Sequence, residues 1–389
     1  MEVLKDIYLI ALRECGNIRR NPIYAFCMIF FPIIVVIFFT SLMGEGVPTK
    51  MPVGIVDLDN TTTSRAIVRQ LESLQTTRIV ESYENVNEAR RDIQKDNIFG
   101  FLYIPNGMTR DIMRGEQAKI SYYYNTEFLL AGNLLYRDLK TAAQLGAAGV
   151  GMTKLAALGK TDKEIAANIQ PIAIDLHMIG NPWTNYNVYL STFIVPGVLL
   201  LFVFLITPYS IGTELKFKRS RQWMAMAHND VYVAITGKML PQTLIFLSIF
   251  YCFEFYIYYI LGFPHPGGVG RMLLLGFLAV ISCQSFGIFA FGLMPSLRMA
   301  MSICSLWSVV SFSVVGATYP LESMDPEIQA IAQMFPLRHY YVIYHTCIFN
   351  NFPLTYVLSE IIALCCFSLL PLFTNRNLKR AMLHDIYIP

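Results

Sequence analysis

Long stretches without charged side chains run through much of this sequence. A helix needs roughly 20 apolar residues to cross about 30 Å of hydrocarbon. Four charge-free runs satisfy this length, and two more do so with one carboxylate each, Glu254 or Glu360. The sequence therefore predicts six transmembrane helices. The runs are Asn21 to Gly44, the later part of Leu176 to Thr213, Met239 to Phe263, Met272 to Leu297, Met299 to Leu321 and Pro353 to Phe373.

The composition agrees with a membrane protein. Of 389 residues, 54% are apolar and 15% are charged, whereas soluble domains carry about 25% charged residues. A soluble enzyme, a nucleic-acid binder and a disordered scaffold are therefore poor interpretations. The net charge of +3 is too small to indicate a polyanionic partner, so we expect no nucleic acid to bind.

The region from Glu45 to Asp175 differs from the rest because it is rich in charges and contains no cysteine. Its pattern alternates between strands and helices, which predicts a small α/β domain without disulfides, inserted between transmembrane helices 1 and 2. The expected strands are Val53 to Val56, Thr77 to Val80, Gly100 to Ile104 and Lys119 to Tyr124; the expected helices are Ser64 to Leu74, Val86 to Lys95, Met108 to Arg114, Glu127 to Leu158 and Asp162 to Asn168.

The Lys and Arg residues of the short loops predict the orientation, because cytoplasmic loops are enriched in them. One side would hold the N-terminal segment, the loop after the second span and the C-terminal tail, which are rich in basic residues, while the other side would hold only Arg271 and Arg338. Both termini are therefore expected in the cytoplasm and the α/β domain outside. The basic residues are Lys5, Arg13, Arg19, Arg20, Lys216, Lys218, Arg219, Arg221, Lys238, Arg298, Arg376, Lys379 and Arg380.

These patterns divide the chain into seven parts. The N-terminal part has apolar residues at helical spacing, so it predicts either a helix in the membrane interface or a helix packed on the protein's own cytoplasmic loops. The expected parts are a cytoplasmic interfacial helix (1–20), transmembrane helix 1 (21–44), an extracytoplasmic α/β domain (45–175), transmembrane helix 2 (184–210), a cytoplasmic loop (211–238), transmembrane helices 3–6 with short external helices at 316–351 (239–374), and a cytoplasmic tail (375–389).

Catalytic and metal-binding motifs are not evident. Asp57 and Asp59 end a predicted strand, but no third ligand is close in sequence and the run is typical of a turn and helix cap. Gly159-Lys160-Thr161 resembles part of a phosphate loop, yet Lys154 stands where the motif requires Gly. We expect no catalytic residue, bound metal or cofactor. His339 and His345, with their Tyr neighbours, favour an aromatic interfacial belt.

Three segments together resemble the permease subunits of bacterial ABC-2 type exporters with an extracytoplasmic insert. They are VGIVDLDNTTTSRAIVRQLE at the start of the inserted domain, IGTELKFKRSRQWMAMAHNDVYVAITGKMLP after the second span, and GATYPLESMDPEIQAIAQMFPLRHYY before the last. GFLYIPNGMTRDIMRGEQAKISYYYN matches the strand, Ile-Pro, helix, Gly, strand pattern of that domain. The similarity covers nearly the whole chain, although Glu214 is followed by Leu-Lys-Phe-Lys-Arg instead of the family's Glu-Arg-Glu-x-Gly-Thr string.

The resemblance implies the partners. The ATP and Mg would be bound by separate ABC ATPase (nucleotide-binding) subunits, and the permease would pair with a second copy or a related permease in the bacterial cytoplasmic (inner) membrane. Membrane lipids surround such a protein, and a periplasmic adaptor protein is a further partner that the sequence leaves open. The residues matching the ATPase-coupling segment are Glu214, Lys216, Lys218, Arg219, Arg221 and Gln222. On charge alone, the same cluster is also explained as positive-inside anchoring.

The two intramembrane carboxylates support a separate hypothesis. Helix rise places Glu254 roughly 13 Å and Glu360 roughly 10 Å from the outer ends of their spans, and ionisable residues at such depths are costly. We expect both, with Tyr258 one turn from Glu254, to line the substrate path or its outer gate. The alternative is that each is buried at a helix interface and satisfied by nearby hydroxyls.

Together these features predict the permease subunit of an ATP-driven exporter for a lipophilic or amphipathic substrate. The alternative is a non-transporting membrane receptor, or secretion accessory protein, that uses its external domain to bind a partner.

Overall fold

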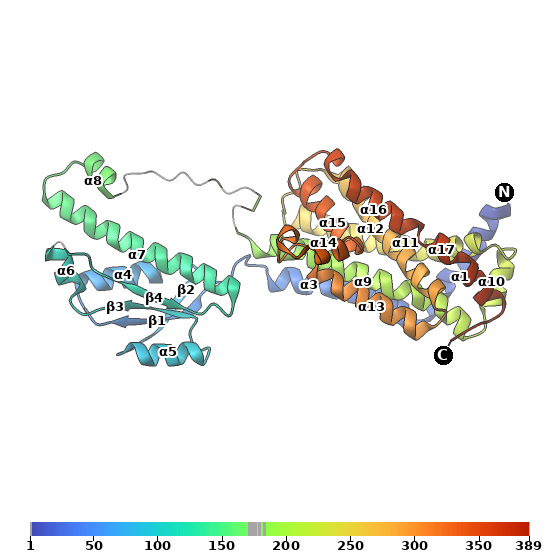
Figure 1. Cartoon of the computed structure of the whole chain (residues 1–389), viewed down its shortest axis with the longest axis horizontal. Coiled ribbons are helices and arrows are strands. Elements are labelled where there is room, and N and C mark those ends of the chain that lie inside the picture. The colour runs from blue at the N-terminus through green and yellow to red at the C-terminus, as the bar shows by residue number, and fades with distance from the viewer. Residues whose placement is uncertain (1, 115, 170–176, 178–179, 182–183, 389) are drawn as a thin grey trace. The chain divides into compact units, whose positions relative to one another are not determined.

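The computed structural model describes residues 2–388 except 115, 170–176, 178–179 and 182–183. It divides into two compact units (Figure 1). The helical unit comprises Met1–Gly44 and Asn185–Pro389, and the inserted unit comprises Glu45–Thr184. The expected end of the external domain at residue 175 and the start of the second apolar run at residue 176 lie outside the described residues.

The inserted unit is built on a four-stranded sheet with the order β2-β1-β3-β4. Its central strand β1 pairs in parallel with β2 and β3, and β4 pairs with β3 in the antiparallel direction. All expected strands and helices of this region are present, so the α/β prediction is confirmed. The elements are β1 (Met51–Asp57), α4 (Thr62–Glu72), β2 (Thr77–Ser82), α5 (Val86–Gln94), β3 (Gly100–Ile104), α6 (Met108–Arg114), β4 (Ser121–Tyr124), α7 (Leu129–Ala157) and α8 (Asp162–Ile169).

Helices cover both faces of this sheet (Figure 1). Side chains alternate along a strand, so Val53 and Ile55 of β1 pack with α4 and α7, while Val56 packs with α5 on the other face. Helix α4 begins with a capping box in which Thr61 and Ser64 bond reciprocally. Continuous apolar packing on both faces explains how the unit is stable without disulfides.

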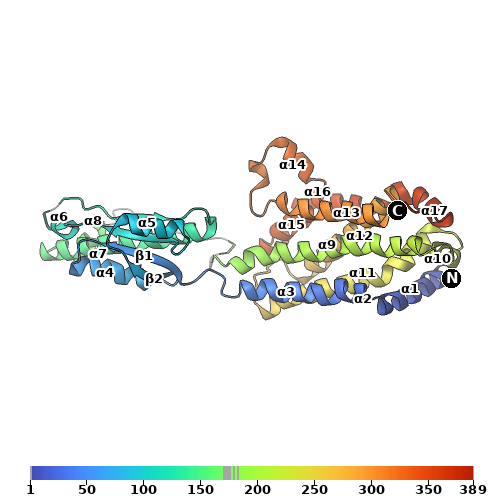
Figure 2. The ribbon, with the colours of Figure 1, turned by 90° about the horizontal axis from the view of Figure 1, so that it is seen from below.

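The helical unit contains the apolar segments. Its main elements are α1 (Glu2–Arg20), α2 (Pro22–Ala25), η1 (Phe26–Phe30), α3 (Phe31–Leu42), α9 (Tyr186–Lys216), α10 (Ser220–Met226), α11 (Val231–Phe255), η2 (Tyr256–Ile260), α12 (Val269–Leu293), α13 (Leu297–Ser313), η3 (Leu321–Ser323), α14 (Pro326–Ala332), α15 (Pro336–Ile343), η4 (Tyr344–Phe349), η5 (Leu354–Val357), α16 (Leu358–Leu369) and α17 (Pro371–Leu383). In Figure 2, α1, α10 and α17 lie at one end of this unit and α14 at the other.

Five helical segments among the described residues are long and apolar enough to cross a membrane, whereas six were expected. They are Pro22–Leu42, Tyr186–Lys216, Val231–Ile260, Val269–Leu293 and Leu354–Leu383.

The remaining expected span, Met299 to Leu321, forms the shorter helix α13. This helix has 17 residues, which gives a length of about 25 Å. It ends at Ser313, and Gly316 then adopts a φ of 89°, a conformation that interrupts a helix. The run is charge-free as predicted, but its backbone leaves the helix before the run ends.

Candidate functional site

A group of charged and polar side chains is buried where α1, α9 and α11 meet. We call it the buried ionic cluster and define it by Glu14, Ser210, Glu214, Lys238 and Gln242. None of these five side chains is more than 1% exposed. Charged residues are seldom fully buried unless they are paired, so the pairing within this cluster determines what it can do.

Lys238 of α11 joins the two buried carboxylates. Its Nζ lies 2.6 Å from Oε2 of Glu14 on α1 and 3.1 Å from Oε1 of Glu214 on α9. Three helices that are far apart in the sequence therefore meet at one ammonium group. Lys238 and Gln242 are four residues apart and share one face of α11.

Amide and hydroxyl groups complete the cluster. Gln242 Nε2 donates to Glu14 Oε1 at 2.8 Å and to Ser210 Oγ at 2.6 Å. Ser210 Oγ donates to the same Glu14 oxygen at 3.2 Å, and Asn17 Nδ2 donates to Glu14 Oε2 at 3.1 Å. The Glu14 carboxylate is thus held from α1, α9 and α11 at once.

Arginine side chains close the cluster towards the surface. Arg13 Nη2 lies 2.7 Å from Glu214 Oε2, and Arg219 Nε lies 3.8 Å from the same oxygen. The positive charges of Lys238 and Arg13 balance the negative charges of the Glu14 and Glu214 carboxylates. Removing one partner of such a buried pair typically costs 3–5 kcal/mol because the other charge is left uncompensated.

The short helix α10 is attached to the same cluster. Trp223 of α10 is fully buried, its ring lies 5.2 Å from Lys238 Nζ, and its indole N–H donates to the carbonyl of Ala234 at 3.2 Å. A cation over an indole face is attracted by the ring. Trp223 therefore places α10 in direct contact with Lys238.

Helix α1 reaches this position because Gly237 leaves room for it. A Cβ atom at Gly237 would lie 2.8 Å from Ile10 Cβ and 3.0 Å from the Ile7 carbonyl oxygen. On another side of α1, the apolar residues Leu4, Tyr8 and Leu12 are exposed at a spacing of four. One side of α1 therefore packs on α11, and a second apolar side stays available to a membrane interface.

The residues expected to contact an ATPase are in two different environments. Glu214 is buried, because α9 continues to Lys216 and carries Glu214 on the helix, not in the loop. Arg219 is half-buried; Lys216, Lys218, Arg221 and Gln222 are exposed beside or on α10.

The C-terminal tail also contacts α10. Arg221 Nε lies 2.8 Å from Asp385 Oδ2, and Ser220 Oγ donates to Asp385 Oδ1 at 2.6 Å and to the carbonyl of Met382 at 2.9 Å. Residues of α1, α9, α11 and the C-terminal tail therefore lie around α10.

Glu254 lies in an apolar and aromatic environment. It is 6% exposed, and Tyr258, one helical turn further along the chain, is 4% exposed. In the described part of the chain it makes no hydrogen bond or ion pair, and none joins it to Glu360.

Glu360 has a partner that the sequence did not identify. His339 Nδ1 hydrogen-bonds to the Glu360 carboxylate, and His339 Nε2 lies 2.9 Å from the carbonyl of Gln333. His339 is 3% exposed and links α15 to α16. It was expected in an aromatic interfacial belt.

Glu14 and Gln242 were also not identified as site residues from the sequence. Glu14 lies four residues after Ile10, so helical spacing places it on the same buried face of α1. This spacing was the available signal, because a carboxylate on a packed face needs a partner.

Asp59 stabilises the inserted unit locally. Its carboxylate accepts hydrogen bonds from the backbone N–H of Gly107 at 3.0 Å and from the hydroxyls of Thr61 and Thr109 at 2.8 and 2.5 Å. It thereby caps the beginning of α6. Among the described residues, no group of His, Cys, Asp or Glu side chains could hold a metal ion.

Comparison with known families agrees with this architecture. A family model described as "ABC-2 family transporter protein" matches residues 22–374. No curated protein matches the chain.

Proposed function

Because the chain belongs to the ABC-2 family of transporter proteins, and is thus a multi-pass membrane permease without an ATPase site, we propose that it serves an ATP-driven exporter. A separate ATPase subunit hydrolyses ATP, and this chain moves a lipophilic or amphipathic molecule out of the cytoplasm or inner leaflet. The setting is the bacterial cytoplasmic membrane, and the permease works as a pair, a symmetric homodimer being the simplest arrangement.

The topology in this proposal has six crossings, with α13 as the fifth. The ends of the chain support it. The tail contacts α10 through Arg221 and Asp385, and Asp6 of α1 lies 3.4 Å from His228 just after α10. Because the first helix and the C-terminal tail both contact the region of α10, they lie on the same side of the membrane. The number of membrane crossings between them must then be even. The positive-inside pattern then assigns this end to the cytoplasm and the inserted unit to the outside.

The observation that carries the proposal is the convergence of Glu14, Glu214 and Lys238. It connects α1 to α9 and α11, which can cross a membrane, and Trp223 attaches α10 to the same Lys238. Separating these charges would leave a buried ion uncompensated. The four helices therefore move as one body, which passes a displacement at the ATPase into the membrane.

The ATPase contact surface consists of the exposed residues around α10. Lys216, Lys218, Arg221 and Gln222 present charge and hydrogen-bond donors there, and the half-buried Arg219 lies between this surface and Glu214. The burial of Glu214 supports a positioning role for this residue instead of direct contact with the ATPase.

At the other end of the bundle, Glu254, Tyr258 and Glu360 form the outer gate of the substrate path in this proposal. The buried, unpaired carboxylate of Glu254 and the bond from His339 to Glu360 support it, because each is a polar feature that apolar packing does not require. Substitution of both carboxylates by Gln is expected to lower transport without loss of ATPase binding.

Affinity purification in mild detergent tests the proposed function. The tagged protein is expected to co-purify with an ATPase subunit in a fixed ratio and to hydrolyse ATP. Combined reversal of Lys216, Lys218 and Arg221 to Glu is expected to abolish this association, whereas reversal of Lys154 in the inserted unit leaves it intact. Preparations free of ATPase, but with an envelope protein attached, would indicate the receptor function instead.

A further inference from the structure

A cavity of about 480 Å³ lies between α11, α12 and the junction of α16 and α17. Its volume is within the roughly 300–1,000 Å³ typical of ligand pockets. It is separate from the buried ionic cluster and from the proposed gate. We call it the lateral groove, because Leu240, Leu244, Phe277 and Leu372 along it have exposed side chains on segments that can cross a membrane.

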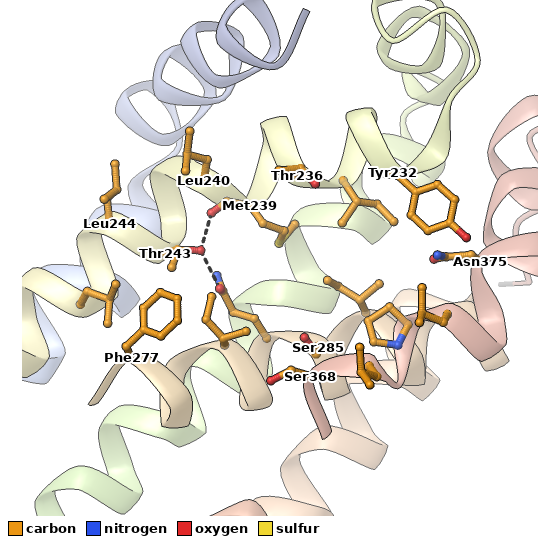
Figure 3. A pocket seen from close by; sticks show the side chains of 18 residues that line it. Tyr232, Thr236, Met239, Leu240, Thr243, Leu244, Phe277, Ser285, Ser368 and Asn375 are labelled. Atoms are coloured by element: carbon orange, nitrogen blue, oxygen red, sulfur yellow. Dashed lines mark hydrogen bonds between the residues drawn. The ribbon is translucent and has the colours of Figure 1, made fainter. Parts of the chain in front are cut away.

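The two ends of the groove differ in polarity. Figure 3 shows Tyr232 and Asn375 near each other at one end, where α11 begins, and Leu244 and Phe277 at the other. The first end lies on the side of α10, and the second lies several turns further along the span. An amphipathic molecule would fit with its polar group between the first end and the middle of the groove, where Gln284 lies, and its chain along the apolar end.

Two buried amide groups in the groove have unused hydrogen-bonding capacity. Gln284 is 3% exposed and Asn375 is 4% exposed. Within the described residues, Gln284 Nε2 and Asn375 Oδ1 have no hydrogen-bond partner. Buried polar groups are almost always satisfied, so these two atoms favour a ligand that brings polar atoms of its own.

The contact of Gln284 with Thr243 does not remove this capacity. Thr243 Oγ1 lies 2.6 Å from Gln284 Oε1 and 2.9 Å from the carbonyl of Met239 (Figure 3). A hydroxyl has one proton, so Thr243 either donates to the amide or accepts from it. In both arrangements one polar atom of the Gln284 amide stays unpaired. A ligand hydroxyl, which both donates and accepts, satisfies either case.

The charge of the groove defines the ligand class. None of its 18 lining residues is Lys, Arg, His, Asp or Glu. A phosphate or ammonium headgroup would be desolvated there without a counter-charge, which is unfavourable. We propose that the lateral groove binds one membrane lipid with an uncharged, hydroxyl-bearing headgroup, of the diacylglycerol class. The proposed lipid binding requires that the protein be inserted in a membrane, but it does not depend on transport activity.

Photolabelling of the full-length protein in lipid nanodiscs tests the proposal. The probe is a diacylglycerol with a diazirine in one acyl chain, present at low mole fraction, and labelled peptides are identified by mass spectrometry. Labelling is expected on the α11 and α12 peptides that contain Leu244 and Phe277. Unlabelled diacylglycerol is expected to compete at least fivefold better than phosphatidic acid with the same chains.

Two substitutions make the test specific. Ile281→Trp fills the groove, and Gln284→Leu removes its free amide; both are expected to lower labelling severalfold. Leu274→Trp is the matched control, because Leu274 is exposed on α12 outside the groove, and it should leave labelling unchanged. Size-exclusion profiles establish that each variant is folded.

Equal competition by phosphatidic acid, or labelling insensitive to Ile281→Trp, would overturn the proposal. So would a disulfide between two copies of the protein through Leu244→Cys, because a second copy would then cover the groove. None of these readouts uses the ATPase, so failure here is distinct from failure of the proposed exporter function.

Discussion

Lys238 Nζ lies 2.6 Å from the carboxylate of Glu14, a residue 224 positions earlier in the chain. Both side chains are 1% exposed. This bond fastens the first helix of the chain to a membrane-crossing segment. It also gives α1 a defined place, whereas its sequence was equally compatible with a helix lying free in the interface.

Replacing Lys238 by Met is expected to destabilise the protein by about 3–5 kcal/mol, because Glu14 and Glu214 would share a buried site with only Arg13 and the more distant Arg219 to compensate them. Thermal unfolding in detergent measures the loss. Lys216→Met is the control, since Lys216 is exposed, and it should change stability by less than about 0.5 kcal/mol. Equal behaviour of the two variants would contradict the assigned burial.

Gly237→Val is expected to release α1 from α11. The new side chain would overlap Ile10 and the Ile7 carbonyl, and overpacking of this kind costs about 1–3 kcal/mol. Limited trypsin digestion should then cleave sooner after Arg13, Arg19 or Arg20. Gly16→Ala serves for comparison, since its added Cβ would have no atom within 4 Å beyond its chain neighbours and the nearby backbone of its own helix. Equal resistance of both variants and the native protein to trypsin would contradict the packing of α1 on α11.

The inserted unit is expected to lose stability in acid through Asp59. Burial raises the pKa of this carboxyl, but hydrogen bonds from Thr109, Thr61 and Gly107 outweigh it, so its pKa lies below the usual value. A carboxyl whose pKa is lowered by folding stabilises the folded state at pH values above its unfolded-state pKa of about 3.9. This stabilisation is lost as the pH falls through the folded-state pKa.

Asp59→Asn should therefore lower the stability of the inserted unit at pH 7 and reduce its dependence on pH below about 4. Hydrogen exchange of the α6 peptide in the full-length protein, corrected for intrinsic rates, measures both effects. Asp111→Asn on α6 provides the reference. An unchanged acid profile for Asp59→Asn would exclude the cap as the cause.

The bond between His339 and Glu360 is expected to appear as an energetic coupling. Single substitutions His339→Asn and Glu360→Gln should each destabilise, and the double variant should cost less than their sum by about 0.5–3 kcal/mol. Thermal unfolding of the four proteins gives this difference. The pair His345→Asn and Glu360→Gln should be additive within about 0.5 kcal/mol, and additivity in the His339 cycle would refute the bond.

The sequence predicted the inserted α/β unit because alternating strands, caps and turns are local signals. Asn85, for example, accepts the N–H of Glu88 at the start of α5. The helix predicted from Met299 to Leu321 was too long, because an absence of charged side chains indicates low polarity but does not determine backbone conformation. The break near Gly316 needed a positive φ that only the structure displays.

The candidate site was only partly predictable. The motif resemblance selected Glu214 and the basic residues after it, but Glu214 is buried whereas those basic residues are exposed or half-buried. The partners Glu14 and His339 come from distant segments, and single-sequence periodicity contains no information on which helices become neighbours. Lys238 was read only as part of the basic loop pattern, since its burial depends on the packing of α1.

We propose that the buried ionic cluster transmits ATPase movement to α9 and α11. Hydrogen exchange of the permease–ATPase complex, with and without trapped ATP, measures this most directly, and Glu14→Gln combined with Lys238→Met removes one charge of each sign. In the native complex, nucleotide should change exchange in α1, α10, α9 and α11; in the double variant, the change should stop at α1 and α10. Identical changes in α9 and α11 in both complexes would contradict the account.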